Sequence, residues 1–384
     1  MSTQLHPAAI ARIVQAVVRA EIVRLRGGRE DALPSGSWAT DMPLGDGGLG
    51  LDSLAFFGIL AALAEMFDLD AATLTEQPPE QISDLLAWVA RAPGGAWGAI
   101  TVATSGSTGR PKRCTHVLAD LLDEAAYFAS MVAGRRRVVA MVCADHLYGL
   151  IWTALLPAVA ALPVVERRIG ARLDLLPGDL VVAVPDQWRV LPRLAGSLPA
   201  DVWGVSSGAP LPGDVEAAVL NVGIERLLDV YGASELSAVA VRVAPDPDYR
   251  LLPRWRLAVG DDAVIDRHGE HWPLPDRVTR TGERALRPVG RRDAAVQVGG
   301  HNVWPQRVAE MLRAVPGVAD ASVRLGADAR LKAFVVPDDG IDARALERSL
   351  QERAALMSAP ERPVRYAYGA ALPRTPMGKL ADWS

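Results

Sequence analysis

The stretch Thr104-Ser105-Gly106-Ser107-Thr108-Gly109-Arg110-Pro111-Lys112 is the part of the sequence that points most directly to a fold. It follows the β-branched run Ile100-Thr101-Val102-Ala103, which predicts a strand that ends in a loop. Glycines let backbone N–H groups approach a phosphate closely, hydroxyls add donors, and Lys112 adds a positive charge. The spacing differs from G-x-x-x-x-G-K-[ST], and Ser/Thr/Gly clusters are also common in surface loops. By itself the stretch therefore fits either a phosphate-binding loop or a polar surface loop.

Length and composition limit the classes of protein to consider. The 384 residues suffice for two or three domains, and 22% charged residues is ordinary for a globular chain. A net charge of -4, with Lys and Arg scattered, favours no nucleic-acid partner. Cys114 and Cys143 give no metal spacing or disulfide framework, and no apolar run reaches the length of a membrane span. We expect a cytoplasmic protein whose oligomeric state the sequence leaves open.

The N-terminal part of the chain predicts a small helical bundle. His6 to Arg26 carries an apolar stripe with helical spacing, Gly27 to Gly50 is rich in Gly, Pro and Ser, and Pro79 to Arg91 is amphipathic. Asp52-Ser53-Leu54 opens an apolar helix between them. This order resembles an acyl carrier protein, in which the serine of Asp-Ser-Leu carries a phosphopantetheine arm, and Ser53 matches that serine.

Two other interpretations of the Asp-Ser-Leu tripeptide stay open. Asp52 or Ser53 would serve equally well as an N-cap for the helix that follows. A bundle of this shape would also serve as a packing or docking surface without any modification of Ser53. The short linker from Ala92 to Ala96 predicts a domain boundary after the bundle.

Strand-like and helix-like patterns alternate in the middle of the chain. Buried strands are predicted at Val138 to Cys143, Leu180 to Val184 and Val202 to Val205, and a further segment at Ile224 to Val230. Polar motifs follow several of these strands, and the carboxyl edge of a parallel sheet is where α/β proteins bind ligands. The motifs are His146-Leu147-Tyr148-Gly149-Leu150, Ser206-Ser207-Gly208-Ala209-Pro210-Leu211 and Tyr231-Gly232-Ala233-Ser234-Glu235.

From about Ile100 to Ser384 these ordered motifs resemble the adenylate-forming superfamily of acyl-CoA synthetases, peptide-synthetase adenylation domains and firefly luciferase. The resemblance implies an α/β fold in which a truncated large domain with mixed and parallel sheets is followed by a small α+β lid. With the bundle, we expect three domains, which are a helical acyl-carrier-protein-like domain at residues 1–93, a truncated adenylation domain at 97–290 and a C-terminal lid at 294–384.

The resemblance also implies how ATP and the acid are bound. His146 borders the acyl pocket, Tyr231 stacks on adenine, and Glu235 holds Mg²⁺, a hard cation that binds carboxylate and phosphate oxygens. Residues implied at the ATP phosphates are Thr104, Ser105, Gly106, Ser107, Thr108, Gly109 and Lys112. Residues implied along the adenine and the α-phosphate are Ser207, Gly208, Ala209, Gly232, Ala233 and Ser234.

The ribose-binding aspartate is placed by spacing within the family pattern. The family has this aspartate about fifteen residues before the arginine of a Gly-Arg-x-Asp hinge. Here that arginine is Arg291, so the count leads to Asp276 and makes Asp293 the hinge. Thr281-Gly282-Glu283 resembles the usual Thr-Gly-Asp motif, but it then falls in a hairpin turn. Arg291 would contact the ribose or a phosphate.

Two motifs in the lid complete the implied machinery. Gly299 and Gly300, in a Gly-Gly-x-Asn loop similar to that of aryl-CoA ligases, match the loop that lines the pantetheine tunnel. Lys379, in a C-terminal loop, matches the lysine that reaches the acyl carboxylate and the α-phosphate. The resemblance thus implies two steps, adenylation with ATP and Mg²⁺ and then transfer to a phosphopantetheine thiol, with lid rotation at Asp293 between them.

The sequence departs from the family pattern in two places. Arg113 stands where the family has a glycine after the lysine, and the family's about one hundred or more residues before the phosphate loop are absent or replaced by the bundle. We expect a small aromatic acid such as a hydroxybenzoate as substrate, with a fatty acid second, and an acyl carrier protein, in cis on Ser53 or in trans, as acceptor. The alternatives are a plain acyl- or aryl-CoA ligase that uses free CoA, with the bundle as a structural replacement, and a catalytically silent scaffold.

Overall fold

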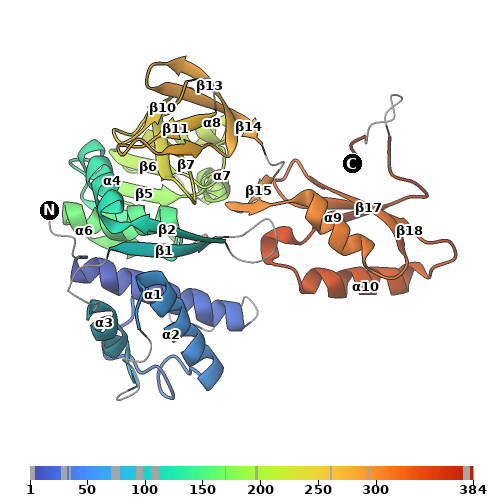
Figure 1. Cartoon of the computed structure of the whole chain (residues 1–384), viewed down its shortest axis with the longest axis horizontal. Helices are drawn as coiled ribbons and strands as arrows, with labels where there is room; N and C mark the ends of the chain where they lie inside the picture. Colours follow the sequence, from blue (N-terminus) through green and yellow to red (C-terminus); the bar gives the residue numbers. More distant parts are fainter. Residues whose placement is uncertain are drawn as a thin grey trace. The chain divides into compact units, whose positions relative to one another are not determined.

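In the computed structural model the chain forms two compact units (Figure 1). The large unit contains Met1–Thr104, Pro111–Leu274 and Arg280–Arg287, and the small unit contains Ser105–Arg110, Pro275–Thr279 and Pro288–Ser384. The structure describes residues 5–26, 33, 36–70, 78–91, 98–104, 112–168, 170–194, 198–259, 262–292, 295–374 and 381–383.

Three helices form the N-terminal bundle predicted from the apolar stripes. They are α1 (Pro7–Leu25), α2 (Ser53–Phe67) and α3 (Ile82–Ala90), and α1 contacts both others. Asp52 is the N-cap of α2, because its Oδ1 accepts a hydrogen bond of 2.8 Å from the N–H of Ala55. The N-cap interpretation of this tripeptide is therefore confirmed for Asp52, while Ser53 is the first helical residue and is exposed.

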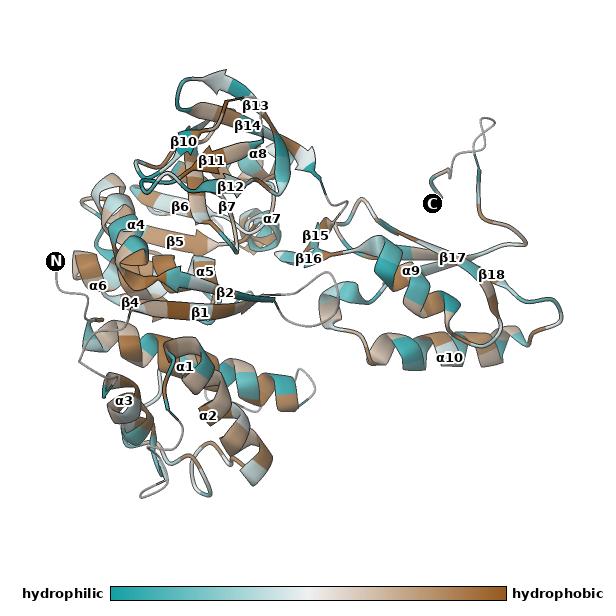
Figure 2. Cartoon of the chain, in the orientation of Figure 1, coloured by the Kyte–Doolittle hydropathy of each residue, from teal (hydrophilic) through white to brown (hydrophobic). Residues whose placement is uncertain are grey.

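A sheet of nine strands has the order β13-β14-β9-β8-β7-β6-β5-β3-β4, and it belongs to the large unit except for residues 276–279 of β13 and 288–291 of β14. β4, β3, β5, β6 and β7 are parallel, whereas β7, β8, β9 and β14 are antiparallel. The parallel part follows the buried strands predicted from the sequence, and Figure 2 shows hydrophobic residues along β5, whose five residues are all buried. The bounds are β3 (Arg137–Ala140), β4 (Val164–Glu166), β5 (Asp179–Ala183), β6 (Val202–Ser206), β7 (Ile224–Ala233), β8 (Ser237–Val243), β9 (Tyr249–Leu251), β13 (Asp276–Gly282) and β14 (Ala285–Arg291).

Helices pack against this sheet and against a separate hairpin. The hairpin is β1 (Ala99–Thr104) with β2 (Lys112–Val117), and a three-stranded sheet is formed by β10 (Arg256–Leu257), β11 (Ala263–Ile265) and β12 (His271–Pro273). The helical segment that follows the His146 motif begins as a π-helix, η3 (Leu150–Leu155), and continues as α6 (Leu156–Ala160). The other helices are α4 (Leu118–Met131), α5 (Leu147–Gly149), α7 (Pro185–Leu194) and α8 (Gly213–Asn221).

The N-terminal bundle packs within the large unit. α1 contacts η3 and α6, and α2 contacts β1. Arg12 of α1 donates a hydrogen bond of 2.5 Å to the carbonyl of Thr153 in η3. Arg113, which stands where the family pattern has a glycine, donates to Glu65 of α2 over 2.8 Å. The departure from the pattern at Arg113 therefore coincides with a contact between the bundle and β2.

The small unit is α+β, as the sequence predicts. An antiparallel pair β17–β18 and a parallel pair β18–β19 form its sheet, and buried residues such as Val308, Leu331 and Leu346 form its core. The elements are β15 (Val296–Val298), β16 (His301–Val303), α9 (Pro305–Arg313), β17 (Val318–Leu325), β18 (Leu331–Pro337), α10 (Ala343–Ala355), the 3-10 helix η4 (Ala359–Glu361) and β19 (Arg365–Tyr368).

Buried charges join β7 to β8 where the sheet changes from parallel to antiparallel. The guanidinium of Arg242 donates to Oδ2 of Asp229 from Nε (3.0 Å) and Nη2 (2.8 Å). Tyr249 donates to the same oxygen over 2.5 Å, and Glu216 of α8 lies 2.7 Å from Arg242. Asp229 is 2% exposed, so solvent does not replace a lost partner.

We expect Asp229→Ala to lower the free energy of unfolding by about 3–5 kcal/mol, because it leaves the Arg242 guanidinium buried without its main acceptor. Tyr249→Phe is the matched control, since it removes one hydrogen bond to the same oxygen and costs about 1 kcal/mol. Urea denaturation followed by circular dichroism measures both. Equal losses in the two variants would show that the buried charge is not the source of the stability.

Candidate functional site

The parallel strands place several of the predicted motifs at one edge of the sheet. β3, β5, β6 and β7 run in the same direction, so their carboxyl ends meet at the same edge. His146 follows β3, Ser207 directly follows β6, and the segment from Tyr231 to Glu235 ends β7 and continues beyond it. The expected carboxyl-edge arrangement of these motifs is therefore present in the large unit.

Lys112 and Glu235, which are 123 residues apart in the sequence, meet in the structure. Nζ of Lys112 donates to Oε1 of Glu235 over 2.6 Å, and this hydrogen bond raises the pKa of Lys112. The side chains are 56% and 42% exposed, and an exposed pair of this kind contributes only about 0–1 kcal/mol to stability. The pair therefore brings the end of the predicted phosphate loop to the predicted metal ligand without being important for folding.

Gly232 allows a close backbone approach in the Tyr231–Glu235 segment. A Cβ at this position would lie 2.4 Å from the carbonyl oxygen of Ser237, so a larger residue would force β7 and β8 apart. The register of the β7–β8 pair also shifts between Tyr231 and Gly232, as at a β-bulge. Tyr231 meets the ring of Tyr249 edge to face, with 6.0 Å between the ring centroids.

The other motifs at this edge are held by backbone contacts. The hydroxyl of Ser207 donates to the carbonyl of Val230 over 2.8 Å, which links the end of β6 to β7. The hydroxyl of Tyr148 lies within hydrogen-bond distance of the carbonyls of Ala183 (3.1 Å) and Val205 (2.8 Å). Tyr148 therefore contacts the ends of β5 and β6, whereas the side chain of His146 is 58% exposed.

Sequence reasoning missed the residues that lie beneath the Tyr231–Glu235 segment. Glu124 of α4 is 3% exposed and accepts a hydrogen bond of 2.9 Å from the hydroxyl of Ser237. It follows Leu121 by three residues and precedes Phe128 by four, so a carboxylate stands in the apolar stripe of α4. A carboxylate at a position of the apolar stripe is the feature of the sequence that could have pointed to Glu124.

The small unit holds the residues predicted at the ribose. Asp276 begins β13 and Arg291 ends β14, and the N–H of Arg292 donates to the carbonyl of Pro275 over 3.0 Å. The ends of the two neighbouring strands therefore hold Asp276 and Arg291 near one another. Between the strands, residues 283–284 form the turn, so Thr281-Gly282-Glu283 falls at the hairpin turn as predicted.

Gly299 and Gly300 form the two-residue turn between β15 and β16. Their φ values are 58° and 80°, which is the conformation that a tight hairpin turn with two glycines requires. Several predicted site residues lie outside the described residues. They are Ser105, Gly106, Ser107, Thr108 and Gly109 of the phosphate loop, the hinge Asp293 and the lysine Lys379.

The described residues fit a magnesium ion bound largely by substrate. Among them no group of three or more His, Cys, Asp and Glu side chains forms a metal centre. Mg²⁺ in nucleotide sites uses one or two carboxylates together with phosphate oxygens, and the exposed carboxylate of Glu235 suits that coordination.

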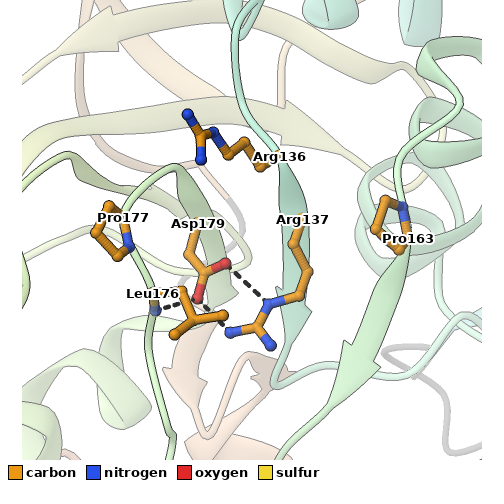
Figure 3. Close-up of a pocket in the computed structure, with 6 residues that line it drawn as sticks. All are labelled: Arg136, Arg137, Pro163, Leu176, Pro177 and Asp179. Carbon is orange, nitrogen blue, oxygen red and sulfur yellow. Dashed lines mark hydrogen bonds and ion pairs between the residues drawn. The ribbon is translucent and has the colours of Figure 1, made fainter.

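Two cavities lie away from this edge. One of about 400 Å³ lies where β3 and β5 begin, and Figure 3 shows Asp179 there between Arg137 and the N–H of Leu176. The other, of about 520 Å³, is in the N-terminal bundle and is lined by Ser53 and Phe57 among others.

No helix in the described parts of the chain is long and apolar enough to cross a membrane.

Solved structures with the same fold come from enzymes of differing activity. The amide bond synthetase of Marinactinospora thermotolerans aligns with a TM-score of 0.57 at 21% identity, over 74% of this chain and 68% of that chain. A double mutant of the o-succinylbenzoate CoA synthetase of Bacillus subtilis aligns with a TM-score of 0.58 at 18% identity, over 73% of this chain and 67% of that chain. At these identities the likeness shows the fold alone.

Sequence relatives extend over nearly the whole chain. This chain is 38% identical to the 4-coumarate–CoA ligase of Rhodobacter capsulatus, over 97% of its length and 100% of that protein. It is 33% identical to the 4-coumarate–CoA ligase of Halorhodospira halophila, over 97% of its length and 98% of that protein. The family model described as AMP-binding enzyme matches residues 91–283. The chain therefore belongs to the AMP-binding enzyme family, and it is an AMP-forming acid–thiol ligase that activates its acid with ATP as an adenylate.

Proposed function

We propose that the protein joins an aromatic carboxylic acid of the 4-coumarate type to free CoA, with ATP converted to AMP and pyrophosphate. The observation that carries this proposal is the near-complete match to two 4-coumarate–CoA ligases, which includes the N-terminal bundle. A relative of that activity aligned over its entire length supports a CoA ligase in which the bundle is part of the enzyme. This acceptor is the alternative that the sequence left open, and it is now preferred over a carrier protein.

The reaction has two steps with a common acyl-adenylate. A carboxylate oxygen of the acid bonds to the α-phosphorus of ATP, and the bond to pyrophosphate breaks. The sulfur of CoA then bonds to the acyl carbon, its proton passes to solvent, and the bond to AMP breaks. Mg²⁺, when bound, neutralises charge on the phosphates.

The proposed roles are those that the family resemblance implies for these residues. Glu235 would bind the metal, with Lys112 beside it at the phosphates. Asp276 and Arg291 would bind the ribose, and Lys379 would stabilise the charge that develops during adenylation. Rotation of the lid about Asp293 would present Lys379 for adenylation and the loop that contains Gly299 for thioester formation, so that one enzyme serves both steps in turn.

The packing of the N-terminal bundle supports its role as a structural part of the ligase. The contacts of α1 with η3 and α6, and the hydrogen bond from Arg12 to Thr153, belong to one compact unit. Such packing is what a segment needs if it replaces the missing start of the large domain.

A second candidate acceptor is a phosphopantetheine arm on Ser53. Ser53 is exposed at the start of α2, next to a cavity of about 520 Å³, so a modifying enzyme would have access to its hydroxyl. This arrangement keeps a carrier role for the bundle as a hypothesis that the same experiment tests.

We expect the purified protein to form a thioester with free CoA when it is given ATP, Mg²⁺ and 4-coumarate. Pyrophosphate release and the ultraviolet absorbance of the thioester measure the two steps. The acid panel also contains 4-hydroxybenzoate and a medium-chain fatty acid, and the rate should be highest with the hydroxycinnamate. Pyrophosphate release without thioester formation from CoA would contradict the proposed acceptor.

The control for that experiment is intact mass after co-expression with a phosphopantetheinyl transferase. A mass increment lost in Ser53→Ala, followed by an acyl increment with ATP and acid, would favour the carrier hypothesis. An unmodified protein that remains fully active with CoA supports the CoA ligase.

We expect Lys379→Ala to slow acyl-adenylate formation at least about a hundredfold, because a charge-stabilising donor to the transition state is lost. Thioester formation from a chemically prepared acyl-adenylate and CoA should change little. Lys379→Arg is the control that retains the charge. A variant that slows both steps equally would contradict the assignment of Lys379 to the first step.

We expect Asp276→Ala to raise the KM for ATP by about tenfold or more, since it removes an acceptor for ribose hydroxyls. Glu283→Ala should leave the KM for ATP unchanged, because Glu283 lies in the hairpin turn. Steady-state pyrophosphate release measures both variants. The reverse ordering would mean that Thr281-Gly282-Glu283 is the ribose motif.

A further inference from the structure

Residues 234–238 comprise the turn between β7 and β8 (234–236) and the first two residues of β8; this segment presents Glu235 and is here named the Glu235 turn. Ser237 in this turn has a φ of 59°, a left-handed conformation that is unfavourable for a residue other than glycine. A strained conformation persists only where surrounding contacts hold it.

A carboxylate lies beneath the turn. Glu124 of α4 accepts hydrogen bonds at Oε1 from the hydroxyl of Ser237 (2.9 Å) and from the N–H of Ala238 (3.3 Å). These two bonds fix the residue with the strained φ and the residue after it. Glu124 reaches them from a helix that is more than a hundred residues away in the sequence.

An arginine and a tryptophan hold the carbonyls of the same turn. Arg254, between β9 and β10, donates to the carbonyl of Leu236, and its Nη2 lies 3.7 Å from Oε2 of Glu124. Trp255 donates from Nε1 to the carbonyl of Ala238 over 2.9 Å. The interior face of the turn is therefore fixed by Glu124 and by the segment that contains Arg254.

A second set of contacts reaches the turn from β2. Nε2 of His116 lies 2.8 Å from the carbonyl of Ser234, and burial lowers the pKa of His116, so the neutral ring donates its Nε2–H to that oxygen. Lys112, on the same strand and four residues earlier, pairs with Glu235. Contacts on both sides thus converge on the one residue predicted to bind metal.

Glu124 is an unfavourable residue for its position. Burial raises the pKa of Glu124 to about 7, and its Oε2 has no hydrogen-bond partner in the described structure. A buried carboxyl group with an unsatisfied oxygen lowers stability relative to an apolar residue of similar size. The hydrogen bonds that offset this loss of stability are those that Glu124 accepts from the Glu235 turn. This indicates that the role of the Glu124 carboxylate is to hold the turn.

We propose that Glu124, with Arg254, is a positioning residue that holds the Glu235 turn so that the Glu235 carboxylate is preset for Mg²⁺ and the ATP phosphates. The inference rests on the proposed role of Glu235 and extends it to a residue that does not touch substrate. Partners that orient a metal ligand typically change metal affinity or activity by about 10–100-fold when they are removed.

The test compares Glu124→Ala, Glu124→Gln and Asp179→Ala. Calorimetry measures the affinity for ATP as a function of the Mg²⁺ concentration, and ATP–pyrophosphate exchange with 4-coumarate measures turnover. Glu124→Ala should raise the Mg²⁺ concentration needed for half-maximal ATP binding by about tenfold. Glu124→Gln should restore most of that affinity, because its carbonyl oxygen can accept from Ser237 and Ala238.

Asp179→Ala is the matched control. Asp179 is a carboxylate that is 1% exposed, and it too accepts from an arginine and from a backbone N–H, but at the start of β5 (Figure 3). It should lower the melting temperature without changing the Mg²⁺ requirement. An equal change of the Mg²⁺ requirement in Asp179→Ala would overturn the inference by reducing it to general stability.

Ser237→Ala provides a second route if Glu124→Ala does not fold. It removes the hydroxyl that donates to Glu124 and should reproduce part of the increase in the Mg²⁺ requirement. An unchanged requirement in a folded Glu124→Ala or in Ser237→Ala would overturn the inference. Because ATP binding is measured without turnover, a wild-type protein that binds Mg²⁺ and ATP but shows no exchange with any acid would contradict the proposed function and still test the role of Glu124.

Discussion

The antiparallel pairing of β7 with β8 is the constraint on which the rest of the large unit depends. Five parallel strands, β4, β3, β5, β6 and β7, direct their carboxyl ends to one edge, and the chain then reverses at that edge instead of crossing back through a helix. The buried pair of Asp229 with Arg242 stabilises the reversal from within the sheet. Glu235, at the reversal, is therefore exposed at the end of a segment that is anchored in the sheet.

In the N-terminal bundle, the Asp-Ser-Leu tripeptide leaves the function of the bundle open, whereas the packing of its helices restricts it. Asp52-Ser53-Leu54 resembles a carrier-protein motif, but Asp52 caps α2 and the bundle packs on η3, α6 and β1. One tripeptide is compatible with several functions, because capping and modification use the same residue types at the same place. Packing against three elements of the large unit, by contrast, requires complementary apolar faces along the whole helix.

Periodicity and strand-end motifs predicted the alternating α/β part and the carboxyl-edge placement of His146, Ser207 and Tyr231. These features depend on local patterns that a single segment displays. The meeting of Lys112 with Glu235, the π-helix at η3 and the position of Glu124 beneath Ser237 depend instead on tertiary packing. A buried glutamate in an apolar stripe is visible in the sequence, but its partner is not, because the partner lies on a strand reached only after folding.

Two buried carboxylates, Asp179 and Glu124, differ in role because their hydrogen-bond and ion-pair partners differ. Asp179 and Glu124 are both nearly inaccessible to solvent, yet Asp179 makes two hydrogen bonds with Arg137, whereas Glu124 lies 3.7 Å from Arg254 and keeps an unsatisfied oxygen. The pair at β5 satisfies its charge and needs no further explanation than folding. The pair at α4 is incompletely satisfied and is retained beneath a strained turn. An apolar residue at position 124 would give a more stable fold. The presence of a glutamate there is therefore explained by its holding the turn in position, rather than by a contribution to stability.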